Sequence, residues 1–449
     1  MPPRVSFHTF GCKLNQYETE ALASEFRRAG FQVVSGLREA EVHVVNTCTV
    51  TSRADQKARL LIRSLSGERP AGPVLVTGCS AQTEREALAA LGANVIVVPQ
   101  AEKARILGVA GTLARALEDG SDPLAHLRRA LEGSPAGGAE DPFSLVAGSY
   151  SFHTRAFLKI QDGCDCRCAY CRVPAARGPS RSLALDEVRR RAAELEGQGR
   201  REIVLTGVNI GAWTSGGTGL PGLVGLLLEA SRSVRFRLSS LEPERLTSEL
   251  ADVLSHPRIC AHFHVPLQSG SDAVLSRMRR RYVSETVRDG VRRLRAAKDD
   301  PFVAADVIAG YPGESAEDHV RTLDLVRDCG FAALHVFRFS PRPSTEAATL
   351  RPVVPERVRR ERAAELSVLS RELTAAYVRR WSGREVEVLV QSRTAAQCQG
   401  VSGNYLRVQA AGPLPENVAP GSLIRCVIRQ DAPVLPSGLV AAQFLSLEE

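Results

Sequence analysis

The chain has 449 residues, of which 44% are hydrophobic and 24% are charged, and its formal net charge is +8 at pH 7. A single hydrophobic core stops growing well below this length, so two to four domains are expected. No apolar run approaches the roughly 18 residues of a membrane span, and none of signal-peptide length begins the chain. A cytoplasmic protein without membrane contact is therefore predicted.

Eleven cysteines are more than packing requires in a chain of this size. Disulfides rarely persist in a reducing compartment, so the cysteines favour metal or redox chemistry. The net positive charge is compatible with a polyanionic partner but does not establish one, because many basic proteins bind no nucleic acid.

The first part of the chain alternates short β-branched runs with helical stretches. The runs lie at residues 4–10, 42–46, 73–77 and 94–98. Such alternation predicts an α/β domain with a small parallel sheet over residues 1–118. Residues 119–150, rich in Gly, Pro, Ala and acidic side chains, are predicted to form a linker in which 123–131 can form one helix.

Six further strand-like runs alternate with helices rich in Arg and Glu. These runs are residues 156–161, 202–206, 234–240, 261–266, 302–308 and 332–339. Six βα units with right-handed crossovers make a partial barrel, whose chemistry lies at the carboxyl ends of its strands. Together with a long charged helix at 352–380, they form a predicted domain over 151–380. Residues 383–446 have alternating strands with Gly and Pro turns, which predicts a small all-β barrel.

Three cysteines follow the first barrel strand with the spacing Cys-x3-Cys-x2-Cys, at Cys164, Cys168 and Cys171. Three thiolates at this spacing can hold three corners of a 4Fe-4S cube and leave the fourth iron without a protein ligand. Zinc is the main alternative, but zinc sites usually present paired Cys-x2-Cys units, and no second pair follows. Cys166 adds a fourth thiol, interpreted as a bystander, with cluster mis-ligation or repair as the alternative.

Three other cysteines end strands of the first domain, namely Cys12, Cys48 and Cys79. Successive parallel strands have their carboxyl ends on one edge, so the three loops can converge on a second cube with an open iron. From spacing alone, three coincidental thiols are an equal alternative. The remaining four cysteines lack cluster spacing and are interpreted as packing residues: Cys260, Cys329, Cys398 and Cys426.

Several motifs resemble the methylthiotransferase family of radical S-adenosylmethionine (SAM) enzymes. They are Gly-Cys-Lys-Leu-Asn-Gln-Tyr-Glu-Thr-Glu (11–20), Asn-Thr-Cys-Thr-Val (46–50), Thr-Gly-Cys-Ser-Ala-Gln (77–82) and Leu-Lys-Ile-Gln-Asp-Gly-Cys (158–164). The resemblance runs nearly end to end. It implies a multidomain α/β protein with a flavodoxin-like N-terminal domain, a partial (β/α)6 radical SAM barrel and a C-terminal TRAM barrel.

The same resemblance implies two 4Fe-4S clusters and SAM as cofactors. The radical-generating cluster would bind Cys164, Cys168 and Cys171. The auxiliary cluster, whose open iron would carry the sulfur to be inserted, would bind the second set, which is Cys12, Cys48 and Cys79. No protein side chain is assigned as catalytic, since the clusters and SAM would carry the radical chemistry.

Residues near the strand ends of the barrel are implied as SAM contacts. Tyr170 would lie against the adenine, with simple packing as an equal alternative. The other candidates are Thr206, Gly207, Asn209, Ser239, Ser240, Glu242, Gln268, Asp306 and Gly310. Close backbone approach at Gly207 makes physical sense, because a bulkier residue would block the ligand. Individually, each could be only a turn residue.

The motifs at 11–19, 205–211 and 237–243 look like the branch that acts on N6-threonylcarbamoyladenosine in tRNA. The implied reaction converts this nucleoside, at position 37 beside the anticodon, to its 2-methylthio derivative, with SAM as both methyl donor and radical source. An external low-potential electron donor and a sulfur source would be partners. The alternative is a methylthiotransferase for N6-isopentenyladenosine, and a more distant one is a non-catalytic iron–sulfur carrier.

The best candidate for contact with RNA phosphates is residues 276–298, which carry nine basic side chains against two acidic ones. A solvated helix face is an equal alternative for any single residue. The tail from residue 383 has five Arg against six acidic residues, so RNA binding there would need local patches or aromatic contacts such as Tyr405.

Overall fold

The computed structural model describes residues 1–36, 39–67, 72–132, 141–148, 154–431, 434–435 and 437–448. The chain divides into two compact units. The first comprises Met1–Phe152, Asp162–Cys166 and Cys171–Arg181, and the second comprises His153–Gln161, Arg167–Tyr170 and Ser182–Glu449. None of the described helices is both long and apolar enough to cross a membrane.

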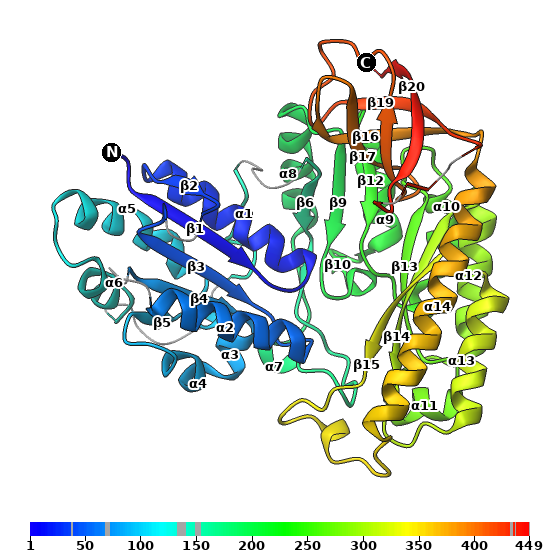
Figure 1. Ribbon diagram of the computed structural model, residues 1–449, viewed down its shortest axis with the longest axis horizontal. Helices are drawn as coiled ribbons and strands as arrows, with labels where there is room; N and C mark the ends of the chain where they lie inside the picture. Colours follow the sequence, from blue (N-terminus) through cyan, green and yellow to red (C-terminus); the bar gives the residue numbers. More distant parts are fainter. Residues whose placement is uncertain are drawn as a thin grey trace. The chain divides into compact units, whose positions relative to one another are not determined.

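The first unit is built on a parallel sheet with the strand order β2-β1-β3-β4-β5 (Figure 1). Its strands are β1 (Arg4–Thr9), β2 (Gln32–Val34), β3 (Val42–Thr47), β4 (Val74–Gly78) and β5 (Val95–Val97). Every residue of β3 and β4 is buried, as expected for a parallel sheet with both faces covered. The order 2-1-3-4-5 is that of a flavodoxin-like doubly wound fold, in agreement with the predicted class. Sequence reasoning missed β2, which has only three residues.

The first unit also contains helices on and around this sheet. They are α1 (Lys13–Arg28), α2 (Ser52–Gly67), α3 (Cys79–Thr83), α4 (Arg85–Ala89), α5 (Arg105–Glu118), α6 (Pro123–Glu132), α7 (Val173–Arg177) and the 3-10 turn η2 (Gln100–Glu102). The helix expected at 123–131 is confirmed as α6. The Oδ1 atom of Asp122 accepts a hydrogen bond from the backbone N–H of Leu124, which satisfies a donor at the start of this helix. Residues 133–140, in the glycine-rich part of the predicted linker, lie outside the described residues.

The second unit contains the six predicted barrel strands. They are β6 (Ala156–Lys159), β9 (Glu202–Thr206), β12 (Arg235–Leu238), β13 (His262–Gln268), β14 (Phe302–Ala309) and β15 (Ala333–Arg338). They pair in parallel as β12-β9-β6 and β13-β14-β15, and an isolated bridge between Phe236 and Ile259 links the two groups. The strands thus follow chain order around a partial βα barrel.

The helices of this barrel are α8 (Leu185–Gly197), α9 (Leu220–Ala230), α10 (Ser248–Leu254), α11 (Asp272–Arg277), α12 (Ser284–Ala297), α13 (Ala316–Cys329) and α14 (Glu356–Trp381). Short connecting elements are β7 (Gln161–Asp162), β8 (Arg181–Ser182), β10 (Thr214–Ser215), β11 (Thr218–Gly219), η3 (Ile210–Ala212), η4 (Pro243–Arg245) and η5 (Glu346–Ala348).

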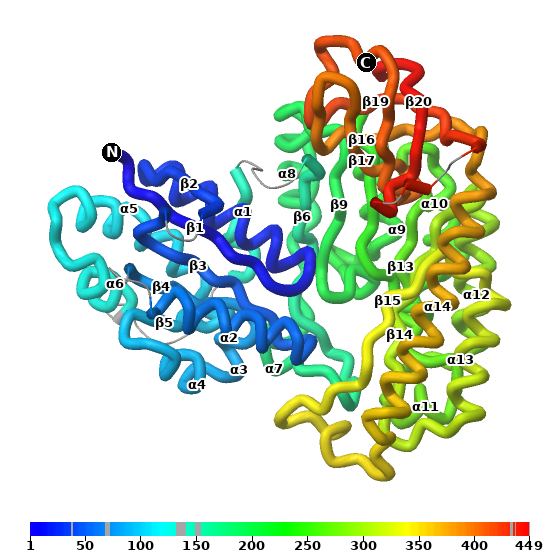
Figure 2. The backbone as a smooth tube through the Cα atoms, in the orientation of Figure 1, coloured from blue at the N-terminus to red at the C-terminus, as the bar shows by residue number. Residues whose placement is uncertain are grey.

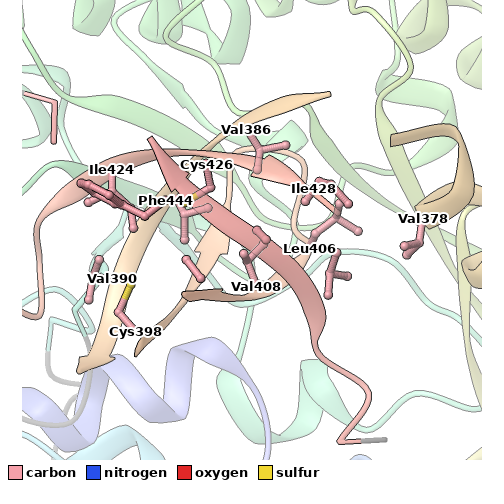
Figure 3. Packing of buried hydrophobic residues seen from close by; sticks show 14 of the residues in the cluster. Val378, Val386, Val390, Cys398, Leu406, Val408, Ile424, Cys426, Ile428 and Phe444 are labelled. Atoms are coloured by element: carbon pink, nitrogen blue, oxygen red, sulfur yellow. The ribbon is translucent and has the colours of Figure 1, made fainter. Parts of the chain in front are cut away.

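The end of the chain forms a closed β-barrel, drawn in orange to red in Figure 2. Its strands are β16 (Glu385–Arg393), β17 (Gln397–Ser402), β18 (Arg407–Ala411), β19 (Leu423–Ile428) and β20 (Val440–Leu447), in the order β16-β17-β18-β20-β19. Figure 3 shows Val408, Cys426 and Phe444 gathered between these strands. Cys398 and Cys426 are buried in this core, as predicted for packing residues. The same apolar cluster includes Phe302 of β14 and Tyr377 of α14, so the two barrels share a core.

A buried ion cluster joins the partial barrel to the β-barrel. Glu202 of β9 is fully buried and accepts hydrogen bonds from Nε of Arg235 at 2.9 Å and Nε of Arg237 at 2.7 Å. Although burial alone would raise the pKa of Glu202, the two guanidinium groups hold it below its usual value. Arg237 also donates to the carbonyl oxygens of Ser402 and Gly403 on the β-barrel. Ion pairs and hydrogen bonds therefore add to the apolar contacts between the two barrels.

Candidate functional site

Cys12, Cys48 and Cys79 lie at the carboxyl ends of three strands that are neighbours in the sheet. Cys12 follows β1 and caps α1, Cys48 follows β3, and Cys79 begins α3 directly after β4. In a doubly wound sheet, ligands bind outside the carboxyl ends of the strands where the strand order reverses, here between β1 and β3. The three thiols are therefore placed at the edge where this fold binds ligands.

Two glycines let the cysteine loops approach each other closely. Gly11 has a φ of +107°, and a Cβ added there would lie 2.6 Å from Cβ and 2.8 Å from Sγ of Cys48. Gly78 has a φ of +99°, and an added Cβ would overlap the carbonyl oxygen of Thr47. Both positions require glycine for conformation and for space. The space beside the Cys48 thiol is thus kept free of a side chain.

The three thiols are close enough to interact electrostatically. Burial, followed by the neighbouring Cys79 and Cys12, raises the pKa of Cys48 to about 12. Burial also raises the pKa of Cys79, an effect that the nearby Arg177 guanidinium opposes. Thiolates that repel one another need a shared cation. Three cysteines on one edge match the donor set of a 4Fe-4S cube with one open iron.

A buried ionic network lies beside these thiols. Arg177, the last residue of α7, donates from Nη1 to Glu18 Oε1 at 2.8 Å and to Asp162 Oδ1 at 3.0 Å. Lys103 pairs with the same Glu18, and all four side chains are at most 4% exposed. The two cations favour the thiolate form of Cys79. Sequence reasoning missed Arg177 and Lys103, because no spacing relates them to the cysteines.

The Cys-x3-Cys-x2-Cys loop is shared between the two units. Cys164 and Cys171 belong to the first unit. There the backbone N–H of Cys166 donates to Sγ of Cys164 at 3.3 Å, and that of Val173 donates to Sγ of Cys171 at 3.4 Å. The side chain of Cys166 and then burial raise the pKa of Cys164. The N–H donors favour the thiolates that a cluster requires.

Replacing Gly163 with Ala is expected to disrupt the radical-generating cluster selectively. Gly163 has a φ of +70°, and an added Cβ would overlap the carbonyl oxygen of Pro179, so the backbone leading to Cys164 must move. Iron content after anaerobic reconstitution should fall from about eight to about four atoms per chain. Gly120→Ala is the matched control, because Gly120 has a φ of +68° with open space around its added Cβ. Equal iron loss in both variants would contradict this explanation.

Cys168 belongs to the second unit and contacts a residue that sequence reasoning did not assign. Nη1 of Arg280 donates to Sγ of Cys168 at 3.3 Å, and Nη2 of the same guanidinium pairs with Glu242. A cation held against a thiol favours its thiolate form. In this structure Glu242, expected as a SAM contact, positions Arg280. Arg280 lies between Arg279 and Arg281, and the sequence alone did not show which of the three arginines contacts a cysteine.

Three candidate SAM contacts present buried polar atoms at strand ends. Thr206 Oγ1, Asn209 Oδ1 and Ser239 Oγ are buried and have no hydrogen-bond partner among the described residues. Buried polar groups are normally paired, so three such atoms after β9 and β12 indicate a place for a polar ligand. A Cβ added to Gly207 would lie 2.8 Å from Oε1 of Gln161, so a protein side chain already requires glycine at this position, and the approach of a ligand there stays a prediction.

Three other candidates occupy constrained or packed positions. Gln268 ends β13 with a φ of +63°, a strained conformation of the kind found at functional sites. Gly310 follows β14 with a φ of +74°, and its missing side chain leaves room for Arg359. The Tyr170 ring lies edge-on to Tyr311, with centroids 6.3 Å apart, and packs against the apolar cluster that contains Tyr311.

Asp306 differs from the strand-end expectation, whereas Ser240 lies two residues after the end of β12, as expected. Asp306 is the fifth of the eight residues of β14, and its Oδ1 lies 2.9 Å from Nε2 of His264. Ser240 Oγ lies 2.6 Å from Nδ1 of the same histidine. Ser240, His264 and Asp306 therefore form one hydrogen-bonded chain that runs from the end of β12 to the interior of β13 and β14.

The basic segment 276–298 is largely paired with acids from other parts of the chain. Arg288 pairs with Asp328, Arg295 with Asp300, and Arg279 with Glu346. Arg288, Arg292, Arg295 and Arg380 also line a cavity of about 450 Å³, together with Asp300 and Asp328. These pairs reduce the positive charge that the segment offers to phosphates, and its contact with RNA stays a prediction.

Comparison with known proteins agrees with this geometry. Residues 4–99 match the model described as uncharacterized protein family UPF0004, and residues 158–326 match the radical SAM superfamily. The chain is 36% identical to the threonylcarbamoyladenosine tRNA methylthiotransferase MtaB of Treponema pallidum (strain Nichols), covering 83% of this chain and 88% of that one. It is 35% identical to a tRNA-2-methylthio-N(6)-dimethylallyladenosine synthase of Sorangium cellulosum (strain So ce56), covering 84% and 79%.

Solved structures share the fold. The radical SAM methyltransferase TsrM from Kitasatospora setae aligns with a TM-score of 0.52 at 17% identity, over 78% of this chain and 77% of that chain. The partial barrel, the cysteine loop and the superfamily match define a radical SAM enzyme. With relatives of this identity and coverage, the chain belongs to the methylthiotransferase family. Its cofactors are 4Fe-4S clusters and SAM.

Proposed function

We propose that this enzyme converts N6-threonylcarbamoyladenosine at position 37 of tRNA to its 2-methylthio derivative. The observation that carries the proposal is the presence of two three-cysteine sites in one chain, one at the switch point of the doubly wound sheet and one in the barrel loop. When bound, the two clusters and SAM supply the sulfur, the methyl group and the radical. The 36% identity to a relative with this named activity supports the choice of nucleoside.

Different residues of the chain are proposed to bind the two clusters and SAM. The first cysteine set, Cys12, Cys48 and Cys79, holds the auxiliary cluster, and the set in the barrel loop, Cys164, Cys168 and Cys171, holds the radical-generating one. Thr206, Asn209 and Ser239 bind SAM through the buried atoms described above. The reaction needs a low-potential electron donor and a sulfur source, and we place it in the cytoplasm, where tRNA is modified. The unpaired buried atoms argue against a carrier that only stores a cluster.

A methylthiotransferase for N6-isopentenyladenosine is the alternative function. It is favoured by the 35% identity to the dimethylallyladenosine synthase, which is close to the identity of the first relative. The domain organisation does not distinguish the two substrates, since both activities belong to relatives that this chain covers over most of their length.

Nucleoside mass spectrometry tests the choice of substrate. A strain lacking the gene is expected to accumulate N6-threonylcarbamoyladenosine, and returning the gene should restore its methylthio form. The matched control returns the Cys164→Ala variant, which should restore nothing because the radical-generating cluster loses a ligand. If returning the gene restored only methylthio-isopentenyladenosine, the enzyme would be a methylthiotransferase for N6-isopentenyladenosine.

A further inference from the structure

The inner face of β14 changes from apolar to polar and back to apolar. Side chains alternate between the two faces of a strand, so Phe302, Ala304, Asp306 and Ile308 share one face. Phe302 and Ala304 belong to the core shared with the C-terminal β-barrel. Ile308 packs against a second apolar cluster that contains Tyr311 and Phe339. Asp306 therefore lies between two apolar layers.

Two histidines from the adjacent strands complete a polar layer at the level of Asp306. Oδ1 of Asp306 lies 2.9 Å from Nε2 of His264 on β13 and 3.2 Å from Nδ1 of His335 on β15. The strand register places His335 directly opposite Asp306. Ser240 extends the layer through its 2.6 Å contact with His264. Four polar side chains thus come together from four different segments of the barrel.

This polar layer is accessible and retains unused hydrogen-bonding capacity. The side chains of His264 and Asp306 are 13% and 22% exposed, whereas that of His335, on the terminal strand of the sheet β13-β14-β15, is 55% exposed. Both histidines contact Oδ1 of Asp306, and its Oδ2 has no hydrogen-bond partner among the described residues. Burial alone would raise the pKa of Asp306, but the two histidines lower it to about 2, so the carboxylate is ionised.

The layer suits a ligand group that both accepts and donates hydrogen bonds. Both ring nitrogens of His264 are engaged by Asp306 and Ser240. His335 contacts Asp306 through Nδ1, so its Nε2–H can donate to a carboxylate or carbonyl, and the second carboxylate oxygen of Asp306 can accept from a hydroxyl or amide N–H. A threonylcarbamoyl substituent carries all of these groups. An isopentenyl substituent is a hydrocarbon, and placing it here would remove water from polar atoms without replacing their hydrogen bonds.

We propose that Asp306 and His335 bind the polar substituent on N6 of the substrate adenosine and select it over an apolar one, while His264 holds Asp306 in place. This inference rests on the proposed function and names the residues that would determine its specificity. Because Asp306 and His335 bind a part of the nucleoside that does not react, they act on affinity and positioning and not on radical formation.

Binding of anticodon stem-loop RNAs to the reconstituted enzyme tests the proposal. Three RNAs carry adenosine, N6-isopentenyladenosine or N6-threonylcarbamoyladenosine at position 37. His335→Leu should weaken binding of the threonylcarbamoyl RNA by about tenfold, the effect of losing one hydrogen bond to a charged group. Binding of the other two RNAs should change by less than about twofold, and His335→Gln, which keeps a donor, should recover part of the loss. His256→Leu, at a histidine outside the layer, is the control.

The possible failures can be told apart. Wild-type enzyme that forms no methylthio product on the threonylcarbamoyl RNA would refute the proposed function itself. Wild-type enzyme that does form it, with His335→Leu binding all three RNAs as wild type does, would overturn only the role of the polar layer. A divalent transition metal bound one per chain, absent from His335→Leu with both clusters intact, would also overturn it, because these atoms would then be metal ligands. Reductive SAM cleavage without RNA should be equal in all variants.

Discussion

Cys12→Ala is expected to abolish methylthio transfer while reductive cleavage of SAM continues. Cys12 is exposed, and its side chain makes no hydrogen bond at the N-cap position of α1, so its loss should leave the fold intact. Without this ligand the auxiliary cluster has only two cysteines, and iron content should fall from about eight to about four atoms per chain. The barrel loop keeps all its cysteines, so 5′-deoxyadenosine should still form under strong reductant.

A variant that lacks a ligand of the radical-generating cluster shows whether the two clusters have separate roles. Cys164→Ala should also retain about four irons but lose SAM cleavage and methylthio transfer together, because the open iron that binds SAM is lost. Cys329→Ala, at a buried cysteine outside both sets, should keep about eight irons and both activities. Full iron content with normal transfer in Cys12→Ala would show that the N-terminal thiols do not hold a cluster.

Arg177→Leu is expected to lower the free energy of unfolding of the first unit by about 3–5 kcal/mol, the usual cost of removing one partner from a buried ion pair. The change leaves the carboxylates of Glu18 and Asp162 buried with Lys103 as the remaining cation of the four-residue network. Urea denaturation of the cluster-free protein under anaerobic conditions measures the loss. Loss of the positive charge beside Cys79 should also slow reconstitution of the auxiliary cluster.

Two further variants show whether the stability lost in Arg177→Leu comes from the missing charge or from the missing side chain. Arg181→Leu removes an exposed arginine whose Nη2 lies 3.8 Å from Asp141, and surface pairs of this kind contribute at most about 1 kcal/mol. The double variant Arg177→Leu/Glu18→Leu removes a buried cation and a buried anion together, so it should recover part of the stability lost in Arg177→Leu. A double variant less stable by the sum of both single changes would contradict the ionic explanation.

Local patterns predicted the architecture and the barrel-loop cysteine set, whereas the assignment of Cys12, Cys48 and Cys79 to one cluster also needed the family resemblance. Alternating apolar runs indicate parallel strands, and cysteines at three strand ends converge because parallel strands end on one edge. The short strand β2 escaped prediction, since three residues, none of them buried, give little periodic pattern. The order of the strands, which places Cys12 and Cys48 on either side of the switch point, became visible only in the folded sheet.

Tertiary contacts account for what sequence reasoning missed. Arg177 and Lys103 meet Glu18 across more than 80 residues of chain, so no local pattern relates them. Asp306 was expected near a strand end but lies within β14, where its partners His264 and His335 come from neighbouring strands. The charge count for 276–298 could not include the acidic partners of the segment, such as Asp328, because they lie outside it.

The shared core and the Glu202 ion cluster mean that the C-terminal β-barrel is not a detachable module. Cutting the chain before β16 would expose Phe302 and Tyr377 to water and take away the carbonyl oxygens to which Arg237 donates. The two barrels should therefore unfold together in one transition and not as separate domains.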